Sequence, residues 1–119
     1  MKQYLGVDII EIARIEKAID RWGDSFLDRV FTQAEKEKYR TRPESLAARF
    51  AAKEAAVKAL GCTELIYRDI EIVSEPGQRP EITLSGRAES ISKELGITSL
   101  AVSLSHSREY AVAVVTGLV

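Results

Sequence analysis

The pattern of hydrophobic and polar positions predicts that the chain begins with a strand. Residues 3–10 form an apolar, β-branched run interrupted by Gly6 and Asp8, which indicates a strand that is mostly buried. A helix is expected to follow and to end at Gly23, because apolar side chains recur at helical spacing at Ile12, Ile15, Ile19 and Trp22.

Two capping boxes predict the starts of the next helices. Thr32 is followed three residues later by Glu35, and Thr41 is followed in the same way by Glu44. The second box should begin a long, alanine-rich helix over residues 42–60.

The second half of the chain alternates between strand-like and helical segments. It predicts strands over 69–75 and 81–84, a helix over 86–95, and two further strands over 99–105 and 110–116. This order indicates an α+β fold in which a largely antiparallel sheet packs against the long helix. With 119 residues, of which 45% are hydrophobic, residues 1–119 are expected to form one domain.

Composition narrows the class of protein. The chain has no stretch approaching the apolar length of a membrane span and no signal-peptide pattern, so we expect a soluble, cytoplasmic protein that does not bind a membrane. A net charge of −1 gives no electrostatic reason to expect nucleic-acid binding. Cys62 is the single cysteine, and we interpret it as a bystander.

Charge is distributed unevenly along the chain. Residues 29–58 hold eight Lys or Arg against four Glu, whereas residues 59–119 hold five against eight acidic residues. The basic segment could face an anionic ligand or an acidic partner, or it could be a solvated helical face.

Asp8 is the first candidate for chemistry, because burying a carboxylate in an apolar strand is unfavourable without compensation. A bound cation would compensate it. Alternatively, Asp8 lies at the strand end and caps a helix that begins near Ile10.

The long helix carries the second candidate pair, Glu54 and Lys58. At about 100° per residue they fall beside Ala47 and Ala51, whose small side chains would leave room for a ligand along a polar pocket wall. The alternative is an exposed ion pair one turn apart. Lys53 projects into the apolar stripe, so either it snorkels or the buried face is wider than the stripe defined by Leu46, Phe50, Val57 and Leu60.

His106, the only histidine, follows an alternating strand at the point where the chain turns, where it could be structural or could bind phosphate. Asp8 and Glu54 offer the oxygen ligands that Mg²⁺ prefers when it is also bound by substrate phosphates. Lys58, Arg49 and His106 could neutralise those phosphates. The set is typical of phosphoryl-type transfer.

The sequence resembles a known family, the holo-[acyl carrier protein] synthases, which are the small bacterial class of 4'-phosphopantetheinyl transferases. The resemblance covers essentially the whole chain. Its most specific part is the long-helix motif ARFAAKEAAVKALG, and it is also carried by GVDIIEIARI, DIEI, VSLSHS and YAVA at residues 6–15, 69–72, 102–107 and 110–113.

The resemblance implies a magnesium cofactor and names site residues. Asp8 and Glu54 would hold Mg²⁺ with the diphosphate of coenzyme A, and Lys58 would contact the phosphates. Arg49, Gly61 and His106 would lie along the nucleotide, so the residues expected to bind coenzyme A are Arg49, Lys58, Gly61 and His106. Glu54 is the first choice for the general base. Relatives often have Gly-Thr-Gly where this chain has Gly61-Cys62-Thr63, and some have an aspartate in place of Ser107.

The resemblance also implies partners. Arg14 and Arg21 look like the residues with which this family binds the acidic recognition helix of acyl carrier protein, and family members are homotrimers with active sites between subunits. The implied reaction moves phosphopantetheine from coenzyme A to a carrier serine. Two other hypotheses remain from the residues alone: a nonenzymatic module that binds carrier protein or nucleotide, and a metal-dependent hydrolase of coenzyme A.

Overall fold

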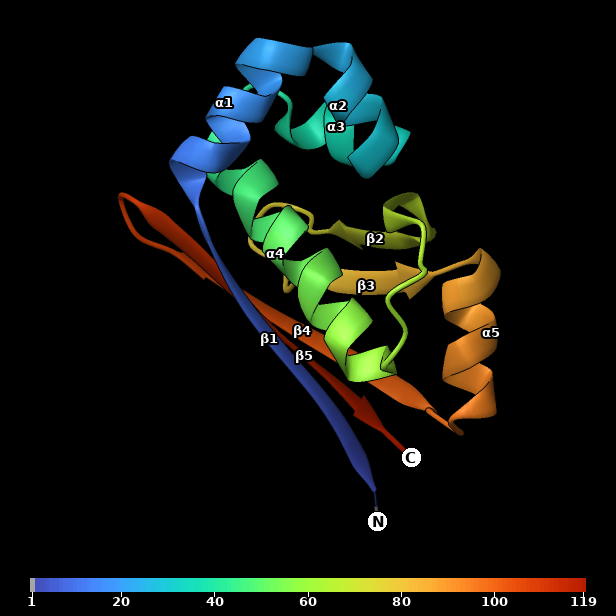
Figure 1. Ribbon diagram of the computed structural model, residues 1–119. Helices are drawn as coiled ribbons and strands as arrows, with labels where there is room; N and C mark the ends of the chain where they lie inside the picture. The colour runs from blue at the N-terminus through green and yellow to red at the C-terminus, as the bar shows by residue number, and fades with distance from the viewer. Residues whose placement is uncertain (1) are drawn as a thin grey trace.

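The computed structural model describes residues 2–119, which fold into two antiparallel sheets around a long helix (Figure 1). The larger sheet has the order β1-β5-β4, and the smaller sheet pairs β2 with β3. The strands are β1 (Gln3–Glu11), β2 (Ile70–Val73), β3 (Glu81–Leu84), β4 (Ser99–His106) and β5 (Tyr110–Leu118). The predicted α+β class with antiparallel strands and a long helix is confirmed.

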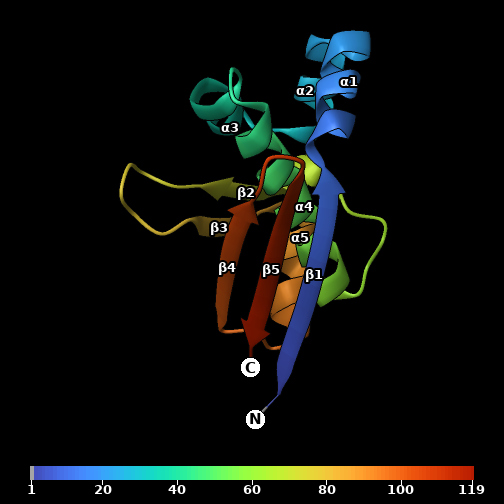
Figure 2. The same cartoon turned by 90° about the vertical axis from the view of Figure 1, so that its left-hand side faces the viewer.

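The long helix, α4 (Pro43–Leu60), lies across one face of the larger sheet (Figure 2). Helices α1 (Ile12–Trp22), α2 (Asp24–Val30) and α3 (Gln33–Tyr39) surround its beginning, and α5 (Gly86–Glu94) lies near its end (Figure 1). The sequence did not predict α2, a helix of only seven residues. Within residues 2–119, no helix is long and apolar enough to cross a membrane.

Helix α4 is buried on nearly every side. Its alanines pack against the sheet and the other helices, and Ala47 and Ala51 have no exposed surface. The prediction that these two alanines leave room for a ligand is therefore wrong, because neighbouring elements fill the space beside them. Phe50 and Val57, which were assigned to the core stripe, are only partly buried.

Only one of the two predicted capping boxes forms. The Thr32 side chain accepts a hydrogen bond from the Glu35 amide, and the Glu35 carboxylate accepts one from the Thr32 amide at 2.9 Å. The second is wrong: α4 is preceded by Arg42 without a side-chain cap, and Pro43 occupies the first turn, where a missing amide hydrogen costs nothing.

Strand β1 is buried on one face only, so the prediction of a mostly buried strand is wrong. Its side chains alternate: those of one parity face α4, and those of the other face away from it. Leu5, Val7 and Ile9 are 65%, 52% and 63% exposed on this outer face. Trp22, expected on the buried side of the first helix, is also exposed.

Gly6 is the point where β1 crosses α4. A Cβ atom at this position would lie 1.8 Å from the Ala55 carbonyl oxygen and 2.9 Å from the Ala59 amide nitrogen. Only glycine permits this approach. Since Asp8 follows two residues later on the same strand face, the crossing brings its carboxylate to the helix.

A fully buried ion pair joins α3 to α4. Lys53 Nζ lies 2.8 Å from Glu35 Oε1, and neither side chain has any exposed surface. Lys53 thus neither snorkels nor reaches water, and the buried face of α4 is wider than its apolar stripe. Burial lowers the pKa of Lys53, while the carboxylate of Glu35 opposes that shift.

Candidate active site

Asp8 and Lys58 form an ion pair where β1 passes α4. Lys58 Nζ donates to Asp8 Oδ1 at 3.0 Å and to the Val7 carbonyl oxygen at 3.0 Å. The Asp8 side chain is 19% exposed and that of Lys58 is 55% exposed. The carboxylate is thus partly shielded from water, while the ammonium remains accessible to an anionic ligand.

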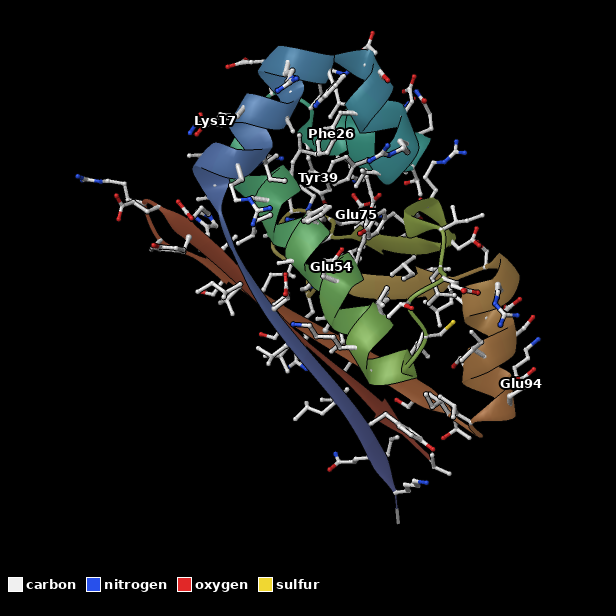
Figure 3. The ribbon with its side chains drawn as sticks, in the orientation of Figure 1. Lys17, Phe26, Tyr39, Glu54, Glu75 and Glu94 are labelled. Atoms are coloured by element: carbon white, nitrogen blue, oxygen red, sulfur yellow. The ribbon has the colours of Figure 1, made fainter. Side chains whose placement is uncertain are left out.

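Glu54 lies one helical turn before Lys58, near the middle of α4 (Figure 3). Its Oε1 accepts a hydrogen bond from the hydroxyl of Tyr67. Burial and the hydrogen bond to Glu54 raise the pKa of Tyr67 to about 12, and the negative charges of Glu54 and Asp8 add to the shift. The negative charges of both carboxylates therefore act on the Tyr67 hydroxyl.

These contacts settle two alternatives. Asp8 is not a helix cap, because it lies within β1 and α1 begins only at Ile12, without a side-chain cap. Glu54 and Lys58 do not form an isolated surface pair, because Lys58 bonds to Asp8 and Glu54 bonds to Tyr67. Asp8 is thus brought to α4 by its pair with Lys58, one helical turn after Glu54, which is held by Tyr67.

Arg49 lies apart from this group, nearer the beginning of α4. Its guanidinium donates to the Tyr39 hydroxyl at 3.0 Å and to Ser74 Oγ at 2.9 Å, and it stacks 3.9 Å from the centre of the Tyr39 ring. The residue is 7% exposed, and within residues 2–119 its Nε has no hydrogen-bond partner. Figure 3 shows Tyr39 beside the start of α4, away from Glu54. A role for Arg49 along a nucleotide stays a prediction.

His106 and Gly61 lie at the ends of β4 and α4. His106 is exposed at the end of β4, in register with Ala111 of β5, which in turn pairs with Ile10 of β1. It is thus two strands away from β1, about 10 Å across the sheet. Gly61 ends α4 in the left-handed conformation with φ of 70°. Their contacts with the nucleotide stay predictions.

Arg14 and Arg21 are exposed on α1, as predicted. The Arg21 guanidinium lies 4.8 Å from the centre of the exposed Trp22 ring. Both cations are therefore accessible to a partner, and their role in binding a carrier protein stays a prediction.

The donors present fit a magnesium ion that is also bound by substrate. Within residues 2–119, no three His, Cys, Asp or Glu side chains are arranged as a metal cluster. Mg²⁺ is commonly held by one or two carboxylates together with waters and substrate phosphates, rather than by a complete protein cage. Asp8 and Glu54 supply that number and type of ligand.

Tyr67 is the residue at this site that sequence reasoning missed. It belongs to the short 3-10 helix η1 (Tyr67–Asp69), and it meets Glu54 only because the chain after α4 folds back along the helix (Figure 1). A tyrosine just before a strand is a common feature, so its spacing alone carried no signal.

Comparison with known proteins identifies the family of the chain. The family model described as "4'-phosphopantetheinyl transferase superfamily" matches residues 4–115, and the chain belongs to this family. The resemblance seen in the sequence is confirmed.

The relatives within the superfamily are holo-[acyl-carrier-protein] synthases. The one from Dehalococcoides mccartyi strain 195 is 50% identical over 113 residues, which are 94% of this chain and 95% of that protein. The one from Moorella thermoacetica is 51% identical over 114 residues, covering 92% and 88% of the two chains. Among solved structures, that of the Helicobacter pylori synthase in complex with coenzyme A is 38% identical, with a TM-score of 0.85 over 96% of this chain and 99% of that one.

Proposed function

We propose that this chain is a holo-[acyl carrier protein] synthase that uses Mg²⁺. The observation that carries the proposal is that Asp8 pairs with Lys58 one helical turn from Glu54 on α4, in a chain that matches this family over nearly its whole length. Two acids next to an accessible ammonium can bind a divalent cation and a diphosphate together.

The reaction is a displacement at phosphorus. The hydroxyl oxygen of a serine in apo acyl carrier protein attacks the phosphorus of coenzyme A that bears the pantetheine arm. The bond from that phosphorus to the bridging oxygen of the diphosphate breaks, the serine proton goes to a base, and adenosine 3',5'-bisphosphate leaves. The products are that nucleotide and the phosphopantetheinylated carrier.

The side chains of the site supply charge and proton transfer. Asp8 and Glu54 would hold Mg²⁺, which when bound stabilises the negative charge that builds on the bridging and leaving oxygens. Lys58 places a cation beside the diphosphate. Glu54 is also the proposed base, taking the serine proton through water, because its Oε1 accepts from Tyr67 and its other oxygen is assigned to the cation.

Residues outside this group are assigned to the rest of the substrates. Arg49, Gly61 and His106 are proposed to bind the nucleotide of coenzyme A. Arg14 and Arg21 are proposed to bind acidic side chains of the carrier, and their exposure on α1 supports this role. Exposed arginines attract an acidic partner and steer its approach.

We also propose that the protein is a cytoplasmic homotrimer. The outer face of the larger sheet supports association, because Leu5, Val7 and Ile9 are more than half exposed there. Contiguous exposed apolar side chains of this kind mark sites of contact with another protein. In such an assembly the nucleotide-binding residues of one chain and the acids of another can complete a single site.

The test is a mass measurement on the carrier. The protein, coenzyme A and Mg²⁺ are incubated with apo carrier, and a gain of one phosphopantetheine group is expected. Glu54→Gln keeps the size of the side chain and should lower transfer at least about 100-fold, while Glu44→Gln, at the start of the same helix, should retain it.

Two outcomes would refute parts of the proposal. Full activity of the Glu54→Gln variant with saturating Mg²⁺ would contradict the assignment of the metal site. Release of adenosine 3',5'-bisphosphate without carrier would instead indicate a hydrolase.

A further inference from the structure

We propose that Tyr67 is a positioning residue that fixes the carboxylate of Glu54 for cation binding, and that the buried Glu35–Lys53 pair holds Tyr67 in place. This inference deepens the proposed function and rests on its assignment of Glu54 as a cation ligand.

The first observation is the contact between the two side chains. The Tyr67 hydroxyl donates to Glu54 Oε1, so one carboxylate oxygen is already bonded within the protein. The Tyr67 ring packs against Phe50, which lies one turn before Glu54 on α4, with 5.5 Å between ring centres. The ring is thus held by packing and the hydroxyl by a hydrogen bond.

The second observation is that α4 also holds the backbone of Tyr67. Lys53 Nζ donates to the Tyr67 carbonyl oxygen at 3.0 Å and to the carbonyl oxygen of Ile70. The same ammonium is paired with Glu35 at 2.8 Å, and both charges are completely buried. Neighbouring residues of one helix, Lys53 and Glu54, therefore bind the two ends of the same tyrosine.

The segment that carries Tyr67 is fixed at further points. The Asp69 amide donates to the Ile66 carbonyl at 3.0 Å, and the Ser85 amide donates to the Asp69 carbonyl at 2.9 Å. The Ile72 amide donates to Glu35 Oε2 at 2.8 Å, so the acid of the buried pair also bonds to the strand that follows. Tyr67 consequently stands on a rigid support.

Such a support has a defined effect on a metal ligand. A glutamate side chain has several rotatable bonds, and ordering it on cation binding costs conformational entropy. A hydrogen bond that holds one oxygen in advance reduces this cost and directs the other oxygen toward the site. Phe50 and Lys53 hold the ring and the backbone of Tyr67, but neither holds the carboxylate of Glu54. The Tyr67 hydroxyl is therefore the group to remove in a test.

The experiment removes only that hydroxyl. Mn²⁺ binding to Tyr67→Phe is measured by electron paramagnetic resonance in the presence of coenzyme A and without carrier protein. We expect binding about 10-fold weaker than in the wild type, as is usual for loss of a residue that orients a ligand. In the carrier assay, the half-saturating Mg²⁺ concentration should rise by a similar factor, and excess Mg²⁺ should restore most of the turnover.

Tyr4→Phe is the matched control, because Tyr4 lies on β1 and is not among the residues assigned to the site. It should bind Mn²⁺ as the wild type does. Lys53→Met should weaken Mn²⁺ binding in the same direction as Tyr67→Phe, with circular dichroism confirming that each variant is folded.

Binding of Mn²⁺ by Tyr67→Phe within twofold of the wild type would overturn the inference, as would an equal loss in Tyr4→Phe. A failure of the proposed function looks different: the wild type would give no mass gain on the carrier, whereas the Mn²⁺ comparison would still report on Glu54.

Discussion

At the scale of single residues, the pairing of Asp8 with Lys58 depends on a glycine, Gly6. Gly6 lets β1 approach α4 so closely that the Asp8 carboxylate reaches Lys58. Asp8 and Lys58 lie about fifty residues apart in the sequence, and the missing side chain of Gly6 is what allows them to pair.

Gly6→Ala should therefore destabilise the protein strongly. The added methyl group would lie 1.8 Å from the backbone oxygen of Ala55, which cannot move without shifting α4. We expect a loss of at least about 3 kcal/mol in the free energy of unfolding, measured by urea denaturation.

Gly117→Ala is its control, because β5 pairs with β1 and the nearest atom to the added carbon would be Cδ1 of the Ile97 side chain, 2.9 Å away, rather than a backbone atom. That side chain can rotate, so the cost should be clearly smaller. Equal losses in the two variants would show that the crossing at Gly6 is not specially tight.

Tyr67 gives a prediction about pH. Its pKa in the folded protein is about 12, against 10.0 for an ordinary tyrosine, so the unfolded chain releases the proton first as pH rises. The contribution of the hydroxyl to stability is then complete below about pH 10 and declines between about pH 10 and 12. Denaturation of the wild type and of Tyr67→Phe at several pH values should show their stabilities converging over that range; a constant difference would contradict the prediction.

The sequence singled out Asp8, Glu54 and Lys58, although the buried strand and the open space beside Ala47 and Ala51 that were expected around them are not found. A carboxylate in an apolar strand and a charged pair beside buried alanines are both anomalous locally, and local anomalies are visible in a sequence. Tyr67 was missed because its importance comes from a contact across the loop after α4, which no spacing encodes.

At the scale of elements, α4 connects every part of the fold. It contacts the larger sheet, α1, α3 and the smaller sheet, and it carries both Lys53 and Lys58. The projection of residues 42–60 at about 100° per residue did not predict which side chains are buried, because it assumes one buried face and one solvated face. A helix surrounded by packed elements has no such division, and the complete burial of Lys53 became evident only with the position of Glu35.

The buried pair should be strongly coupled. Lys53→Met leaves the Glu35 carboxylate without its cation in the core, and we expect a loss of about 3–5 kcal/mol in the free energy of unfolding. The double variant Glu35→Gln with Lys53→Met removes both charges and should recover part of that loss, because glutamine can still accept a hydrogen bond.

Lys58→Met is the matched variant on the same helix, and since its side chain is 55% exposed it should change stability little. A double-mutant cycle compares the losses in the free energy of unfolding of Glu35→Gln, Lys53→Met and the double variant. If the two single losses add up to that of the double variant, Glu35 and Lys53 are not coupled.

At the scale of the whole molecule, α4 covers one face of the larger sheet and leaves the other face bare (Figure 2). The sequence predicted the class of fold and most strand positions, since strands and their turns have short-range signals. It did not predict that Leu5, Val7 and Ile9 would be exposed on the outer face of β1. An apolar residue in a sequence does not indicate whether it packs against its own chain or against another chain.

Ile9→Glu should therefore lower the mass of the protein in solution. A charge in an apolar contact between subunits is not tolerated without a partner, so analytical ultracentrifugation should show a shift from trimer to monomer. Ile66→Glu is the control: Ile66 is 59% exposed, close to the 63% of Ile9, but it lies on the loop after α4. A wild-type monomer, or a trimer unchanged by Ile9→Glu, would refute the proposed assembly.

The pairing of Lys58 with Asp8 has a consequence for how the two proposed ligands, a divalent cation and a diphosphate, affect each other's binding. Asp8, Glu54 and Lys58 together carry a formal charge of −1, which repels an incoming diphosphate. A divalent cation reverses that sign, and a diphosphate in turn supplies the oxygens that two acids alone leave vacant around the ion. At the proposed site each ligand would thus raise the affinity for the other, and thermodynamic linkage requires the two enhancements to be the same factor.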